Sequence, residues 1–179
     1  MVRILEKIKK EEIERWYDDH SDAILKFVLM LVKDYQQAED LTHETFVKAY
    51  LHYESFHQRS SEKTWLFRIA HNLTIDYFRR HRSINLLRDF LSSKRDESRL
   101  PQEMIELKET SAELYHSLEK LKEAYRKVIL LRKIQGFSVT DTANILDWSE
   151  SKVKSTQFRA IPALKKQLVK DGYVYEKTI

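Results

Sequence analysis

The segment from Thr64 to Arg82, TWLFRIAHNLTIDYFRRHR, carries side chains of the types that contact nucleic acid. Leu66, Ala70 and Leu73 recur at helical spacing, so the segment is predicted to form one helix with a buried side. Arginine binds phosphates, asparagine pairs with a base edge, and aromatic rings stack on exposed bases. The candidates for these contacts are Trp65, Arg68, Asn72, Asp76, Arg79 and Arg80. Such a face suits unpaired bases better than an intact duplex.

The helical wheel also predicts how neighbouring side chains support this face. Thr64 is expected on the exposed side, together with the arginines. Asp76 and Arg80 are four residues apart, and we expect an ion pair that holds the arginine in place. The alternative for the rings is burial in the core, which is the commoner role for any one ring taken alone. The rings concerned are Trp65, Phe67 and Phe78.

A second segment, from Gly136 to Leu168, has the pattern of a helix-turn-helix. Gly136 is expected to end one helix, Ser138 to cap the next, and Ser149 to cap the last. Small polar groups near the start of that last helix would reach base edges, with lysine and arginine holding phosphates. The residues are Ser151, Lys152, Lys154, Ser155 and Arg159. The alternative is a solvated face in a plain bundle, but caps, turn and one-sided charge agree on DNA binding.

The elements that must position these residues are predicted to be helices only. The 179 residues include two glycines and two prolines, too few for the turns of a sheet protein, so the fold class is all-α. In the first half we expect helices over 4–18, 21–34, 36–53 and 63–82. In the second half we expect helices over 105–119, 121–135, 138–146 and 150–169. Pro162 is expected to kink or break the last one.

The composition disfavours several classes of protein. There is no cysteine, which excludes disulfides and thiolate sites and fits a cytoplasmic location. The N-terminus lacks the apolar stretch of a signal peptide, and the longest apolar run, Ala23–Val32, is too short to span a bilayer. We find no glycine-rich phosphate loop and no metal-ligand spacing, so we predict no enzyme, no cofactor and no metal. The net charge of +4 hints at an anionic partner.

Three blocks of the sequence together resemble the signature blocks of the extracytoplasmic-function sigma factors, group IV of the sigma-70 family of bacterial RNA polymerase. They read AEDLTHETF (38–46), TWLFRIAHNLTIDYFRRHR (64–82) and LEKLKEAYRKVILLRKIQGFSVTDTANILDWSESKVKSTQFRA (118–160). The resemblance covers nearly the whole chain. It implies two small helical domains, region two over 1–91 and region four over 105–170. A flexible linker over 92–104 would join them, with a tail over 171–179.

The resemblance also assigns roles by position. Segment 64–82 would open the minus-ten element and hold its non-template strand, with Arg59 in the loop that receives a flipped base. The recognition helix from Glu150 would read the minus-thirty-five element. The residues expected to dock on the coiled coil of the polymerase β′ subunit are Glu39, Asp40, Leu41, Glu44 and Phe46. Asp40 and Glu44 are like charges one turn apart, and a basic partner would relieve their repulsion.

The implied partners are core RNA polymerase, through the β′ coiled coil and the β flap, and promoter DNA. An anti-sigma factor, commonly membrane-anchored in this family, is also implied, and a stable homo-oligomer is not. The sequence departs from the family at Thr156, where an arginine is usual, and at Lys152, where a threonine is common. We therefore expect one DNA contact to be missing or replaced by Lys152.

Two other functions are consistent with a helix-turn-helix. A one-component regulator would bind duplex DNA on its own as a dimer, and an RNA-binding or scaffold protein would show no preference for promoter strands. Nothing in the first half suggests a ligand cavity, and the acidic block from Ser21 to Glu62 would have no role in such a regulator. A sigma factor that directs polymerase to promoters and starts DNA melting is the function the sequence favours.

Overall fold

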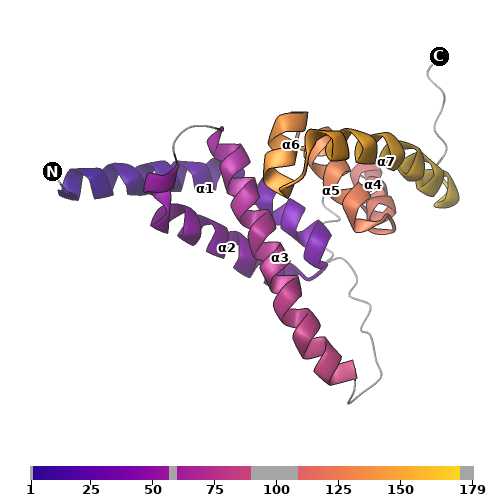
Figure 1. Ribbon diagram of the computed structural model, residues 1–179, viewed down its shortest axis with the longest axis horizontal. Coiled ribbons are helices and arrows are strands. Elements are labelled where there is room, and N and C mark those ends of the chain that lie inside the picture. The colour runs from indigo at the N-terminus through magenta and orange to yellow at the C-terminus, as the bar shows by residue number, and fades with distance from the viewer. Residues whose placement is uncertain (1, 57–59, 90–108, 174–179) are drawn as a thin grey trace. The chain divides into compact units, whose positions relative to one another are not determined.

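The computed structural model describes residues 2–56, 60–89 and 109–173 (Figure 1). The chain divides into two compact units, one ending at Arg99 and the other starting at Leu100. Every regular element in the described residues is helical, which confirms the all-α prediction. The predicted linker over 92–104 and the end of the predicted tail, 174–179, lie outside the described residues.

The first unit contains α1 (Val2–Val32), α2 (Tyr35–Leu51), the short 3-10 helix η1 (Tyr53–Ser55) and α3 (Glu62–Asp89). Helix α1 is continuous where two helices were predicted, so the expected break near Ser21 is wrong. Ser21 and Asp22 often cap helices, but here Asp22 pairs with Lys26 one turn later at 2.7 Å, and Ile24 is fully buried beside them. Tertiary packing therefore outweighs the local preference of these two residues.

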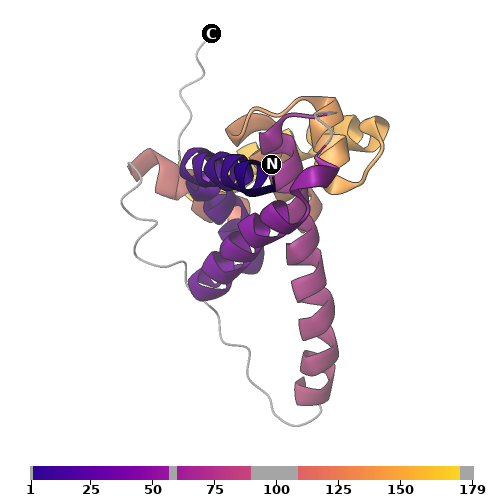
Figure 2. The ribbon, with the colours of Figure 1, turned by 90° about the vertical axis from the view of Figure 1, so that its left-hand side faces the viewer.

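Helices α1, α2 and α3 pack against one another around an apolar core (Figure 2). Lys33 adopts a φ of 60° at the end of α1, and the Asp34 side chain then accepts a hydrogen bond from the Gln37 N–H at 2.9 Å to start α2. Phe27 and Phe67 meet in the interior with ring centres 5.4 Å apart. The core also includes Trp16, Ile24, Val28, Met30, Leu41, Phe46, Leu66, Ala70 and Leu73.

The second unit contains α4 (Glu109–Glu119), α5 (Glu123–Ile129), the π turn η3 (Leu130–Ile134), α6 (Val139–Leu146) and α7 (Glu150–Lys170). The helix predicted over 121–135 is therefore shorter and ends in a π turn, and 105–108 lie outside the described residues. At η3, the Arg132 guanidinium donates to the Gln157 side chain of α7 at 2.9 Å and to the Phe137 carbonyl. This arginine ties the turn before the helix-turn-helix to the recognition helix.

The helix-turn-helix formed by α6 and α7 has the predicted caps. Gly136 has a φ of 74°, a conformation that glycine adopts without strain. The Ser138 hydroxyl accepts from the Asp141 N–H at 2.9 Å, and the Ser149 hydroxyl accepts from the Lys152 N–H at 3.2 Å. Asp147 takes a φ of 55° in the turn between the helices. The capping and turn residues of the sequence were therefore sufficient to predict both helices.

Helix α7 runs through Pro162 to Lys170, so the predicted break at the proline is wrong. Proline removes the N–H that would bond the carbonyl of Phe158. Pro162 and Phe158 are both exposed, so water can satisfy that carbonyl. Leu168, beyond the proline, is buried, and its burial holds the last turns against the unit.

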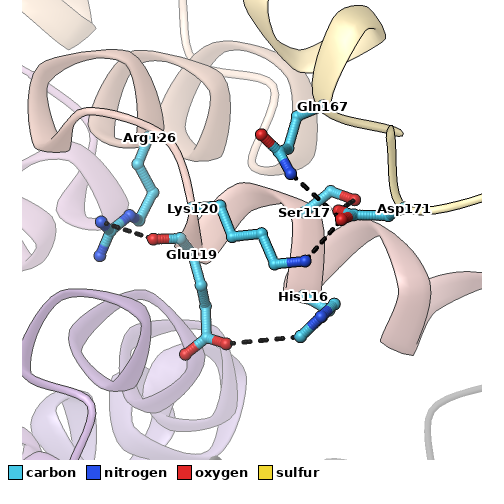
Figure 3. Close-up of polar contacts among 7 residues, drawn as sticks. All are labelled: His116, Ser117, Glu119, Lys120, Arg126, Gln167 and Asp171. Carbon is cyan, nitrogen blue, oxygen red and sulfur yellow. Dashed lines mark hydrogen bonds and ion pairs between the residues drawn. The ribbon is translucent and has the colours of Figure 1, made fainter. Parts of the chain in front are cut away.

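The C-terminal end of α7 is fastened to α4 by Asp171 (Figure 3). Its carboxylate accepts hydrogen bonds from Lys120, from Ser117 at 2.6 Å and from Gln167 at 3.1 Å. These bonds, with Lys120 contributing most, lower the pKa of Asp171 to about 2. Nearby, the buried Arg126 donates to the backbone carbonyl of Glu119 at 3.1 Å, and burial lowers its pKa. The Asp171 contacts orient α7 on α4, and the Arg126 bond joins α5 to the end of α4.

Candidate nucleic-acid interfaces and polymerase-docking face

The polar side of α3 gathers most of the residues predicted to contact unpaired bases. Arg68, Asn72 and Arg79 are exposed on this helix, and they recur at the four- and seven-residue spacings that share one face. Arg80 is also exposed, and Asp76 is half-buried between the arginines. The face therefore offers an amide for a base edge within reach of guanidinium groups for phosphates.

The ion pair predicted between Asp76 and Arg80 is wrong. The Asp76 carboxylate lies 3.5 Å from the Arg79 guanidinium, three residues away. The Arg80 Nε donates instead to the backbone carbonyl of Asp76 at 3.4 Å. In both arrangements an arginine turns back along the helix toward Asp76. This is possible because Asp76 offers both its side-chain carboxylate and its backbone carbonyl to the residues of the next turn.

Thr64 differs from the wheel prediction because it is buried, whereas the burial of Phe67 confirms the core alternative for that ring. The Thr64 N–H donates to the Ser61 hydroxyl at 3.1 Å, and the two hydroxyl groups lie 2.9 Å apart. Thr64 thus belongs to the start of α3 rather than to its exposed face. Trp65 is half-buried, with its ring centre 5.2 Å from that of Phe56, so it presents only part of its ring. Arg59 lies outside the described residues.

The predicted docking face on α2 is only partly available to a partner. Asp40 is exposed and Glu39 and Glu44 are half-buried, whereas Leu41 and Phe46 are buried in the core of the first unit. Glu44 lies 3.8 Å from Lys48, so the helix itself supplies a positive charge to that carboxylate.

Sequence reasoning missed the apolar half of this face. Val47 and Leu51 are largely exposed and follow Asp40 at the seven- and eleven-residue spacings that continue one helical stripe. The exposed face of α2 thus combines carboxylates with apolar side chains. The spacing of Val47 and Leu51 was the available signal.

The five residues predicted on the recognition helix all lie exposed on α7. The Lys152 Nζ sits 4.0 Å from the centre of the Trp148 ring, a cation–π contact. Lys154 lies 3.7 Å from Glu150, and the Arg159 Nε donates to the Ser155 carbonyl at 3.1 Å. Ser151 completes the exposed set near the start of the helix. The structure therefore brings small polar and basic groups together on one face of α7.

Phe158 is a residue of this face that the sequence reasoning did not select. Its side chain is 81% exposed, and it lies on the side of α7 opposite Val153 and Ala160, which are buried. A ring on the exposed side of a recognition helix can contact a thymine methyl group. Thr156 is buried, so this threonine itself offers no contact to DNA, and the expectation that one contact is missing or replaced by Lys152 stays a prediction.

Two further observations concern membrane-spanning helices and metal sites among the described residues. None of the helices in ranges 2–56, 60–89 and 109–173 is long and apolar enough to cross a membrane. The same ranges hold no group of three histidine, aspartate or glutamate side chains placed to bind a metal ion.

Comparison with known proteins identifies both units. Residues 16–84 match the family model of sigma-70 region 2, and residues 111–164 match that of sigma-70 region 4. The chain is 38% identical over 164 residues to the ECF RNA polymerase sigma factor SigX of Bacillus subtilis (strain 168), which covers 89% of this chain and 84% of SigX. It is 32% identical over 155 residues to SigM of the same organism, covering 86% of this chain and 93% of SigM.

The fold is also that of a solved sigma factor. The structure of RpoE from Bartonella quintana, determined with the anti-sigma factor NepR, matches 89% of this chain and 98% of RpoE with a TM-score of 0.72 at 24% identity. At this identity the likeness concerns the fold alone. The two region models and the identity to SigX and SigM carry the assignment. The chain therefore belongs to the extracytoplasmic-function sigma factors of the sigma-70 family, non-enzymatic proteins that direct RNA polymerase to promoters.

Proposed function

We propose that the first unit captures unpaired bases of the minus-ten element and so initiates DNA melting. The exposed face of α3, with Asn72 between Arg68 and Arg79, is the observation that carries this proposal. Bases that open transiently would bond to Asn72, while the arginines hold the strand. Capture of this kind shifts the opening equilibrium without catalysis. The proposed residues are Arg59, Trp65, Arg68, Asn72, Asp76, Arg79 and Arg80.

The second unit is proposed to read the minus-thirty-five element as duplex DNA. A recognition helix enters the major groove with its N-terminal residues near base edges. The exposure of Ser151, Ser155 and Arg159 on one face of α7 supports this role. Lys152 and Lys154 would contact phosphates and add affinity that depends on salt. Region two is proposed to span 1–91, the linker 92–104, region four 105–170 and the tail 171–179.

Core RNA polymerase is proposed to dock on α2, with its β′ coiled coil meeting Asp40, Glu39 and Glu44. Leu41 and Phe46 are buried, so their proposed role is indirect: they pack in the core and hold α2 in place. The β flap would contact region four. We further place the protein in group IV and in the cytoplasm, where polymerase works.

An anti-sigma factor is a further proposed partner. Among solved sigma factors of this fold, RpoE of Bartonella quintana is held by NepR and CnrH by the cytosolic domain of CnrY. A regulator of this kind would keep the protein from polymerase until released.

The test of the melting proposal is open-complex formation with the Asn72→Ala variant. Core polymerase and a promoter carrying 2-aminopurine in its minus-ten element would report melting by fluorescence. We expect the variant to melt DNA about 5- to 150-fold more slowly, since a base-edge amide contact is worth about 1–3 kcal/mol. Its binding to core polymerase should be unchanged. A normal melting rate would refute the role of Asn72.

A one-component regulator remains the second candidate because the helix-turn-helix alone would suit it. A gel shift separates the two functions. A sigma factor should shift promoter DNA strongly only when core polymerase is added, whereas a one-component regulator would shift the duplex on its own.

A further inference from the structure

A pocket opens on the first unit where α1, η1 and the start of α3 come together. Its volume is about 400 Å³, within the range that holds a small ligand or a partner side chain. The lining residues that matter here are Glu12, Trp16, Tyr53, Glu54, Phe56 and Glu62. Glu12, Trp16, Tyr53 and Glu54 have no role in the DNA or polymerase binding proposed above, whereas Phe56 and Glu62 belong to the loop expected to receive a flipped base.

The charge of this pocket favours a cation. Three carboxylates, those of Glu12, Glu54 and Glu62, face one guanidinium, that of Arg15. Arg15 is largely exposed and lies 3.9 Å from Glu12, so it can move aside. The local field therefore attracts a positively charged group and repels the phosphates of nucleic acid.

Aromatic rings form the walls of the pocket. The Trp16 ring centre lies 5.3 Å from that of Phe56 and 5.7 Å from that of Tyr53. These rings pack directly against one another and leave no room between them for a cation. A lysine or arginine in the pocket would instead gain cation–π attraction from the half-buried Tyr53 ring, where Lys9 already places its Nζ 6.0 Å from the ring centre. The Tyr53 hydroxyl donates to Glu12, which joins the two walls across the fold. That bond raises the pKa of Tyr53 to about 12, so the phenol remains protonated near neutral pH.

An apolar stripe on α1 leads to the pocket. Ile4, Leu5 and Ile8 are 64%, 61% and 47% exposed, and the first turns of α1 extend beyond the end of α2 (Figure 1). Ile4, Ile8 and Glu12 are each four residues apart, so the stripe continues directly into the pocket wall. Clustered exposed apolar side chains are typical of protein interaction sites.

We propose that this surface, made of Ile4, Leu5, Ile8 and the pocket behind Glu12, docks a basic amphipathic helix of a protein other than RNA polymerase. Apolar residues of that helix would cover the stripe, and its lysine or arginine would enter the pocket. Charge complementarity selects this occupant over an acidic peptide or a nucleic acid. A separate pocket of about 220 Å³, beside Glu39 and His43, belongs to the α2 face, so the two surfaces are distinct.

Fluorescence anisotropy with the full-length protein tests this proposal. The probes are two labelled helical peptides of about four turns with the same leucine stripe, one with two central arginines and one with glutamates there. We expect the arginine peptide alone to bind. The double variant Glu54→Gln/Glu62→Gln should lower its affinity about ten-fold, because two of the three pocket carboxylates are gone. Ile8→Ser should weaken it as well.

Controls keep the outcome decisive. Glu14→Gln changes an exposed carboxylate on another side of α1, paired with Lys10 at 3.6 Å, and should leave the affinity unchanged. The indole N–H signal of Trp16 in NMR spectra should shift as the arginine peptide is added. Equal binding of both peptides, binding of neither, or full affinity of the double variant would overturn the proposal. The proposal would also be overturned if single-stranded DNA bound the protein and lost affinity in the Ile8→Ser variant.

Discussion

The Nζ of Lys152 lies 4.0 Å from the centre of the Trp148 ring, across the turn that joins the two helices of the helix-turn-helix. Lysine is otherwise a flexible side chain that loses rotamer freedom when it binds. The ring restricts it in advance at the start of the recognition helix. The pair therefore places a positive charge of restricted mobility at the start of the recognition helix.

This pairing predicts a specific change in salt dependence. Lys152→Ala should weaken binding of polymerase holoenzyme to minus-thirty-five DNA and reduce the slope of log affinity against log salt by about 1. Trp148→Leu keeps the charge of Lys152 but removes the ring that restricts it. This variant should weaken DNA binding less than Lys152→Ala does and should leave the slope unchanged. Titrations at several salt concentrations measure both quantities. An unchanged slope for Lys152→Ala would place Lys152 away from the phosphates.

Phe158 is predicted to contribute to base selection. Its exposed ring lies on the same face of α7 as Ser155 and Arg159, where it can cover a thymine methyl. Phe158→Ala should cost about 1 kcal/mol of promoter affinity and should relax selectivity at one base pair of the minus-thirty-five element. Binding to a panel of single-base promoter variants checks this. Lys165→Ala, an exposed change farther along α7, is the matched control.

Much of this architecture follows from local sequence. Gly136, Ser138 and Ser149 could be placed at helix ends because a cap depends on a few neighbouring atoms. The continuity of α1 through Ser21 could not be predicted, since it depends on packing against α2 and α3. The passage of α7 through Pro162 depends in the same way on the burial of Leu168.

The candidate sites were predictable to a different degree. The exposure of polar residues such as Asn72 and Arg159 could be predicted because they fall opposite the apolar side of their helices in the sequence. Thr64 was misplaced because its burial depends on where α3 starts, with Ser61 as its cap. The aromatic and acidic pocket near Trp16 was not predicted, since its walls come from segments about forty residues apart, as the bond between Glu12 and Tyr53 shows.

The Asp171 contacts predict how the second unit responds to acid. The pKa of this carboxylate falls from 3.8 to about 2 on folding, so it stabilises the folded unit above pH 3.8. This contribution is lost progressively as the pH falls from about 3.8 to about 2. Urea unfolding across this range should show the loss, and Asp171→Asn should remove that part of the pH dependence. Asp18→Asn, an exposed change in the first unit, should leave it in place.

The exposed face of α2 predicts how polymerase binding can be disrupted without unfolding the protein. Asp40→Arg reverses a charge on an exposed residue and should weaken binding to core polymerase about ten-fold or more, because opposed like charges across an interface cost several kcal/mol. Val47→Ser should weaken it less, by removing apolar area from the same stripe. Surface plasmon resonance with immobilised core polymerase measures both, with Glu14→Arg on α1 as the control. If Asp40→Arg bound core polymerase as tightly as the parent chain, the docking face would have to lie elsewhere on the first unit.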